Sequence, residues 1–213
     1  MADRIAVIDY GMGNLYSVSR ALEHVNASGR VELTADPARV AAADRVVFPG
    51  QGAMPDCMRE MDARGLRSSV LDAARNKPFL GICIGLQMLF ESSEEGSTTG
   101  LGILPGRVRR FAAAENGLPD GSRLKVPHMG WNQVRQERRH RLWDGLEDDT
   151  RFYFVHSYFP EAGDRDVVQG VATYGVAFTC AVARDNIFAV QFHPEKSQSA
   201  GLRLLANFTH WNP

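Results

Sequence analysis

Residues 78–87 read PFLGICIGLQ, and they indicate which kind of sheet the chain forms. The fully apolar run 78–83 predicts a strand buried on both faces, because a half-exposed strand would alternate apolar and polar residues. A helix is expected to follow from about Gly85 to Glu91. A buried strand followed at once by a helix is the repeating unit of a parallel sheet covered by helices.

The chain before this stretch repeats the same unit. Short β-branched apolar runs alternate with segments whose apolar residues recur at helical spacing. The expected strands are residues 4–9, 31–34 and 45–48, and the expected helices are residues 14–26, with Asn14 as cap, 54–61 and 66–74. This alternation predicts a mostly parallel central sheet with helices on both faces.

After Gly96 the pattern changes to short strands joined by tight turns. The expected strands are residues 108–111, 124–127, 151–158, 167–174, 177–183 and 187–192, with hairpin turns at 174–175 and 184–186 and a last helix at 197–211. The prediction is therefore an α/β fold with a mixed, mostly parallel central sheet to which the C-terminal half adds antiparallel strands. Residues 1–213 are expected to form a single domain, since no segment reads as a long linker.

Composition excludes several classes of protein. The 213 residues carry 24 Lys plus Arg and 25 Asp plus Glu, so nothing indicates a nucleic-acid binder. The longest apolar stretch, residues 79–90, is too short to span a membrane, and the first residues lack the features of a signal peptide, which predicts a cytoplasmic protein. Cys57, Cys83 and Cys180 form no CxxC pair, so neither a zinc knuckle nor a disulfide framework is indicated. No metal and no cofactor are expected.

Cys83 stands where a nucleophile stands in a strand-turn-helix elbow of the form G-x-nucleophile-x-G. The start of the following helix would favour a thiolate, and the backbone N–H of Ile84 would face a developing oxyanion. The alternative is a buried cysteine in a glycine-rich turn, a common place for this residue.

Two further segments could complete such a site. In QFHPEKS (191–197), His193 and Glu195 are two residues apart in an extended chain and would project together, so Glu195 could orient His193 as a general base. In PGQGA (49–53), Gly50 and Gly52 could bring backbone N–H groups to an oxyanion, although a plain turn is the commoner explanation of such a segment.

GICIGLQ, QFHPEKS and PGQGA together, in this order along essentially the whole chain, resemble the class I (triad) glutamine amidotransferases, which have a flavodoxin-like fold. The resemblance implies a glutaminase in which Cys83 attacks the glutamine side-chain amide, His193 is base and then acid, and Glu195 orients His193. It also implies that Gly50, Gly52 and Ile84 bind the oxyanion. The family positions that hold the backbone groups of glutamine match Gln87, Glu95, Ser157 and Tyr158.

Three more segments resemble the family members that serve L-histidine biosynthesis: DYGMGNL (9–15), PHMGWN (127–132) and YFVHSY (153–158). Those members form a heterodimer with a separate (β/α)8-barrel cyclase subunit, which uses the ammonia to make imidazole glycerol phosphate and AICAR. The resemblance places Asn14, Met129, Trp131, Tyr153 and Lys196 on the docking face. Without it, core packing of Trp131 and a solvated Lys196 would be the expectation.

One residue departs from the family pattern. Gln51 stands between Gly50 and Gly52, where the family often has a small apolar residue. If backbone groups do the work, the change is tolerable, but it leaves open how the turn is oriented before the partner binds its substrate. Such a dependence on the partner would be a coupling between two sites.

Other functions remain open at this level. They are a glutaminase subunit for pyridoxal phosphate or anthranilate synthesis, a γ-glutamyl hydrolase or cysteine peptidase, and a binding subunit without catalysis. PHMGWN and YFVHSY speak against the first, and the complete set of Cys83, His193 and Glu195 speaks against the last. His128 and His156 lie in these segments without a role that the sequence defines.

Overall fold

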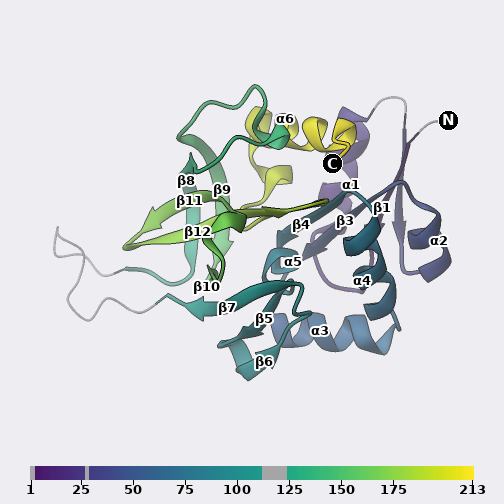
Figure 1. Cartoon of the computed structure of the whole chain (residues 1–213), viewed down its shortest axis with the longest axis horizontal. Helices are drawn as coiled ribbons and strands as arrows, with labels where there is room; N and C mark the ends of the chain where they lie inside the picture. The colour runs from purple at the N-terminus through teal and green to yellow at the C-terminus, as the bar shows by residue number, and fades with distance from the viewer. Residues whose placement is uncertain (1–2, 27–28, 112–123) are drawn as a thin grey trace.

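A mixed sheet runs through the computed structural model, which describes residues 3–26, 29–111 and 124–213 (Figure 1). Among these residues nine strands form the sheet, in the order β2-β1-β3-β4-β13-β12-β11-β8-β9. The strands are β1 Arg4–Ile8, β2 Arg30–Thr34, β3 Arg45–Gly50, β4 Phe79–Cys83, β8 His128–Gln136, β9 Thr150–His156, β11 Val168–Tyr174, β12 Val176–Arg184 and β13 Ile187–Val190. Neighbours from β2 to β13 are parallel and those from β13 to β9 are antiparallel, which confirms the predicted mixed sheet.

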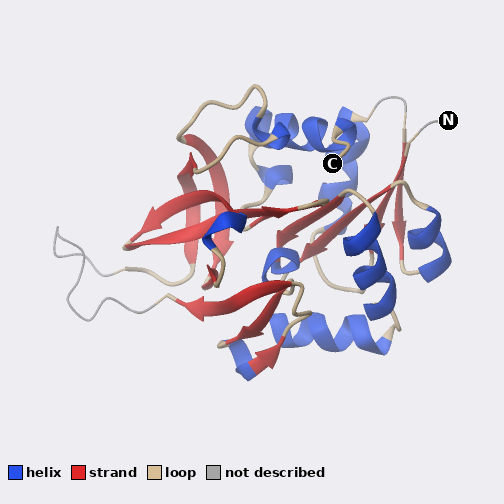
Figure 2. Cartoon of the chain, in the orientation of Figure 1, coloured by secondary structure: helices blue, strands red, loops and turns tan. Residues whose placement is uncertain are grey.

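Helices cover both faces of the parallel part (Figure 2). The helices α1 Leu15–Val25 and α6 Gln198–His210 lie on one face, and α3 Met54–Ala63 and α4 Arg67–Asn76 lie on the other. A shorter helix, α2 Pro37–Ala42, was not predicted. With both faces covered, every residue of β3 and β4 is buried, which explains why residues 78–83 are apolar without alternation.

A second sheet corrects two expectations. Its strands are β10 Tyr158–Ala162, β7 Leu104–Arg110, β5 Phe90–Ser93 and β6 Thr98–Thr99, in that order. The C-terminal strands therefore do not all join one sheet, because β10 pairs with β7 instead. The helix expected up to Glu91 is wrong as well: α5 spans only Ile84–Gln87, and Phe90 pairs with Leu104 in β5. Burial of Phe90 in this pairing outweighs its local helical setting.

Two strand predictions in the C-terminal half also change. Residues 124–127 form no strand, whereas residues 128–136, not predicted as a strand, form β8. Residues 151–158 do not form one strand, because the chain leaves β9 at His156 and enters β10 at Tyr158, in the other sheet. Both predicted hairpin turns are confirmed, between β11 and β12 and between β12 and β13.

The parallel strands bring the chemically promising segments to one edge. Gly50 at the end of β3 pairs with Cys83 at the end of β4, and Val190 at the end of β13 pairs with Ile82. The carboxyl ends of adjacent parallel strands form the usual site region of open α/β sheets. The 49–53 turn, Cys83 and the 191–195 segment therefore meet, although up to 146 positions separate them in sequence.

Candidate active site

Cys83 occupies a strained turn between β4 and α5. Its backbone has φ 57° and ψ −108°, a left-handed region that costs a non-glycine residue about 1–3 kcal/mol. The turn is tight because α5 starts at once against β3: a Cβ on Gly85 would lie 1.8 Å from the carbonyl oxygen of Phe48. These features confirm the strand-turn-helix elbow predicted from the sequence.

A cavity of about 270 Å³ opens at Cys83. Its lining is Gln51, Gly52, Cys83, Ile84, Gln87, Glu95, Pro127, Val155, His156, Ser157, Tyr158 and His193. The structure thus brings together the predicted nucleophile, the predicted base and all four residues expected to hold a substrate. Gly50 is buried just behind this lining, and Glu195 is reached through His193.

His193 and Glu195 form a bonded pair. The His193 Nδ1 atom lies 2.9 Å from Oε1 of Glu195, and their side chains are 3% and 1% exposed. The predicted pairing is therefore present, but the expected geometry was only half right. His193 is extended, whereas Glu195 lies in the short 3-10 turn η4 Pro194–Lys196.

The charge state of His193 follows from its neighbours. Burial alone lowers the pKa of this imidazole, but the negative charge of Cys83 and the bond to Glu195 outweigh burial and raise the pKa to about 10. Its Nε2 atom is buried and has no hydrogen-bond partner among the described residues. The imidazole of His193 therefore holds its proton at neutral pH.

Tyr10 holds the turn that follows β3. Its hydroxyl donates to the carbonyl of Pro49 at 2.7 Å, and a Cβ on Gly50 would lie 2.6 Å from that hydroxyl oxygen. Gly52 has φ +98°, which L side chains rarely adopt, and Gln51 is exposed. The Gln51 position is therefore compatible with a large polar side chain, and its role in orienting the turn remains a prediction.

A chain of amides behind Cys83 was not recognised in the sequence. Gln191, fully buried, has Nε2 3.7 Å from Sγ of Cys83, and its Oε1 accepts from Nε2 of Gln87 at 3.1 Å. Gln87 Nε2 also donates to the carbonyl of Tyr158 at 3.0 Å. Gln191 is the first residue of QFHPEKS, so it lies within a motif that the sequence analysis had singled out. That its side chain points toward Cys83 is visible only in the folded structure.

The other two predicted substrate contacts lie at the cavity rim. Glu95 is half-buried, and its carboxylate accepts from the backbone N–H of Met54 at 2.8 Å. Burial is the main cause that raises the pKa of Glu95 above its ordinary value. Ser157 is the residue that links β9, which ends at His156, to β10, which begins at Tyr158, so a strand fixes the backbone on either side of it.

The five predicted docking residues come from separate segments of the chain. Met129 and Trp131 on β8 are 62% and 44% exposed, so the core-packing alternative for Trp131 is wrong. The Trp131 ring contacts Tyr153 of β9 edge to face, with 6.0 Å between centroids. Lys196 is half-buried, as is Asn14, whose side chain makes no capping bond to α1 despite its predicted cap position.

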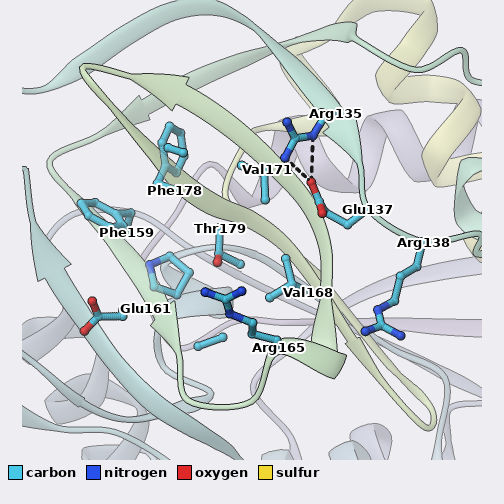
Figure 3. Close-up of a pocket in the computed structure, with 13 residues that line it drawn as sticks. Arg135, Glu137, Arg138, Phe159, Glu161, Arg165, Val168, Val171, Phe178 and Thr179 are labelled. Carbon is cyan, nitrogen blue, oxygen red and sulfur yellow. Dashed lines mark hydrogen bonds and ion pairs between the residues drawn. The ribbon is translucent and has the colours of Figure 1, made fainter.

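A larger hollow lies elsewhere, between β8, β10, β11 and β12 (Figure 3). It has about 650 Å³ and is lined by arginine, glutamate and apolar side chains, including the Arg135–Glu137 ion pair. The described residues that line it include no cysteine or histidine. The smaller cavity at Cys83 is therefore the candidate for nucleophilic chemistry.

The remaining cysteines pack in the core. Cys57 and Cys180 are both fully buried, and burial raises the pKa of the Cys57 thiol to about 11. Among the described residues, no cluster of three or more His, Cys, Asp or Glu side chains could hold a metal ion. None of the helices in the described ranges is long and apolar enough to cross a membrane.

Comparison with known families and sequences points in one direction. The family model "Glutamine amidotransferase class-I" matches residues 6–211. The chain is 68% identical over 209 residues to a protein of Dechloromonas aromatica (strain RCB), with 98% of this chain and 97% of the relative covered. It is 61% identical to one of Nitrosomonas europaea, with 98% and 99% covered. Both relatives are named imidazole glycerol phosphate synthase subunit HisH.

Solved structures share the fold at lower sequence identity. The structure of PurLQS from Thermotoga maritima has a TM-score of 0.73 at 17% identity, with 99% of both chains covered. A crystal structure of a glutamine amidotransferase has a TM-score of 0.69 at 16% identity, with 97% of this chain and 99% of that chain covered.

Proposed function

The chain belongs to the class-I glutamine amidotransferase family, and we propose that it is the glutaminase subunit of imidazole glycerol phosphate synthase. The observation that carries this function is the cavity that gathers Cys83 with the His193–Glu195 pair in a chain 61–68% identical to subunits of that synthase. The high identity disfavours the alternatives of pyridoxal phosphate or anthranilate synthesis and of a γ-glutamyl hydrolase or peptidase. A single domain is supported by the family match over residues 6–211.

Catalysis begins with attack of the Cys83 sulfur on the side-chain carbonyl carbon of glutamine. The carbonyl oxygen gains negative charge, and the backbone N–H groups of Ile84 and the Gly50–Gly52 turn stabilise it. The proton held on His193 passes to the amide nitrogen as the C–N bond breaks, which releases ammonia and leaves a glutamyl thioester on Cys83. The raised pKa of His193 supports this step, because the imidazole holds that proton at neutral pH.

Hydrolysis of the thioester completes the cycle. A water molecule gives a proton to His193 as its oxygen attacks the thioester carbon, and the C–S bond breaks to release glutamate and restore Cys83. Glu195 keeps Nδ1 of His193 protonated and leaves Nε2 as the atom that exchanges protons.

Glutamine is held by groups that line the same cavity. The buried Oε1 of Gln87 has no partner among the described residues and can accept from the substrate's ammonium group. Glu95 offers a carboxylate for that same positive charge, and the Ser157–Tyr158 segment offers backbone groups. The cavity volume of about 270 Å³ suits a small amino acid.

Ammonia is then passed to a partner. The partner is the (β/α)8-barrel cyclase subunit, and the heterodimer docks through Asn14, Met129, Trp131, Tyr153 and Lys196, beside the cavity. Direct transfer keeps ammonia neutral, whereas in bulk water near neutral pH most of it would be protonated and unreactive. A biosynthetic role of this kind also supports a cytoplasmic location.

The test is glutamate release from glutamine, measured with and without the cyclase subunit and its ribotide substrate. We expect turnover in the complete mixture and none with Cys83→Ala, whose circular dichroism should match the original chain. A Cys180→Ala variant serves as control for the loss of a buried thiol. Turnover that persists in Cys83→Ala, or fails in the complete mixture, would contradict the proposal.

A further inference from the structure

Two buried histidines outside the catalytic pair form a continuous set of hydrogen bonds. Nδ1 of His128 lies 2.9 Å from Nε2 of His156, and Nδ1 of His156 lies 2.8 Å from the carbonyl oxygen of Tyr158. At the outer end, Nδ2 of Asn132 lies 3.3 Å from Nε2 of His128. The two histidines are 3% and 5% exposed, so solvent does not supply alternative partners.

The direction of every bond in this set follows from its last member. A carbonyl oxygen only accepts, so His156 carries its hydrogen on Nδ1. Burial lowers the pKa of His156 to about 3, with smaller contributions from the charges of His128 and His193, and burial lowers the pKa of His128 to about 4. Both rings are therefore neutral at neutral pH, and Nε2 of each accepts: from His128 in one case and from Asn132 in the other.

The set ends at the amides behind the nucleophile. The Tyr158 carbonyl that accepts from His156 also accepts from Gln87, which donates to Gln191, whose Nε2 faces the Cys83 sulfur. The bonds thus run from β8, through β9 and the start of β10, to the end of β4. Loss of one bond in such a set loosens the remaining ones, because each amide can rotate only where its partners allow.

We propose that these bonds act as a fixed relay and that His156 is a positioning residue for glutamine hydrolysis, holding the Tyr158 carbonyl that orients Gln87 and Gln191 behind Cys83. The proposal rests on the proposed glutaminase function. It adds a role for PHMGWN and YFVHSY besides docking: His128 of one and His156 of the other meet inside the sheet, while Met129 and Trp131 point outward.

The first test measures the hydrogen-bond directions of the relay and needs no assay of activity. In ¹⁵N spectra of the whole chain, His128 and His156 should both be neutral Nδ1–H tautomers and remain so down to about pH 5, below the ordinary titration range of histidine. His128→Phe and His156→Phe identify the two signals. An Nε2–H tautomer at either ring, or protonation of either ring above pH 6, would overturn the relay.

The second test measures how His156 affects glutamine turnover, in the complex with the cyclase subunit and its substrate. His156→Phe fits among the neighbouring rings of Phe111, Phe154 and Phe178 but donates no hydrogen bond. We expect a kcat/KM for glutamine that is roughly tenfold to a hundredfold lower, with a raised KM. Partial unfolding lowers the active fraction and leaves KM unchanged, so the KM separates positioning from stability.

Two variants complete the design. His156→Asn can still donate to the Tyr158 carbonyl and should bring KM most of the way back to the wild-type value. His140→Phe replaces a histidine that packs on Phe188 and Trp211, away from the relay, and should keep both constants. If the wild-type protein turns over glutamine but KM is unchanged in His156→Phe, the positioning role is overturned and the proposed function stands. If the wild-type protein shows no turnover, both the proposed function and the positioning role are overturned. The histidine tautomers would still test the hydrogen-bond directions by themselves.

Discussion

Nδ1 of His193 lies 2.9 Å from Oε1 of Glu195, and this bond joins the residue that precedes the 3-10 turn η4 to a carboxylate within that turn. The bond fixes which ring nitrogen carries a hydrogen and leaves the other free to face the nucleophile. It also contributes to the raised pKa of His193, about 10, after the larger effect of the Cys83 charge. The pair therefore suits the role proposed for it, in which Glu195 orients His193 and His193 supplies the proton.

Loss of the carboxylate charge should lower the upper pH limit of activity. His193 keeps its proton below about pH 10 and loses it above, so kcat/KM for glutamine should fall as pH rises through that value. In Glu195→Gln the pKa of His193 falls, and this alkaline limb should move down by about one pH unit or more. A pH–rate profile from pH 6 to pH 11 measures the limb. An alkaline limb at the same pH in both proteins would show that Glu195 does not support the protonated imidazole.

Removal of the Gln191 amide should slow the chemistry without unfolding the protein. In Gln191→Leu the Cys83 sulfur loses its nearest amide donor and Gln87 loses an acceptor. We expect a roughly tenfold or greater loss of kcat/KM, the effect of one lost bond and one unpaired buried group. Gln169→Leu is the control, since Gln169 is a buried glutamine of β11 outside the cavity. Equal losses in the two variants would argue against a specific role for Gln191.

Any side chain at Gly85 should disrupt the elbow. Its Cβ would lie 1.8 Å from the Phe48 carbonyl oxygen, so α5 must move away from β3. Gly85→Ala should therefore lower the free energy of unfolding by about 3 kcal/mol or more. Gly65→Ala, with φ +67° and no atom within 4 Å, should cost only about 1–2 kcal/mol of backbone strain. Urea unfolding of both variants measures the difference, and equal losses would show that the elbow tolerates a wider turn.

The exposed aromatic side of β8 should supply binding energy to the partner. Trp131→Ala removes an aromatic ring that is 44% exposed, and we expect the Kd for the cyclase subunit to rise by roughly thirtyfold, typical of a central interface tryptophan. The melting temperature of the isolated chain should change little. Val176→Ala, at a 51% exposed residue of β12, should leave the Kd unchanged. Calorimetric titration of the partner decides, and a Kd unaffected by Trp131→Ala would place the interface elsewhere.

Sequence alone determined the parallel half of the sheet and the elbow at Cys83. A fully apolar strand of residues 78–83 can be accommodated only where helices cover both faces, and a nucleophile between Gly81 and Gly85 requires a sharp turn. Residues 191–197 hold the proposed base and its partner in one short motif, so the sequence predicted that His193 and Glu195 meet, although the 3-10 turn that holds Glu195 was not predicted.

Contacts between groups that are distant in the sequence depend on the folded chain as a whole. The predicted helix to Glu91 gave way to β5 because Phe90 is buried by pairing with Leu104, an interaction that no local pattern encodes. Gln191 reaches Cys83 because β13 and β4 are adjacent and in register, and His128 reaches His156 because β8 and β9 pair residue against residue. Strand order and register arise from the packing of the whole chain, so the bonds behind the nucleophile became visible only in the folded protein.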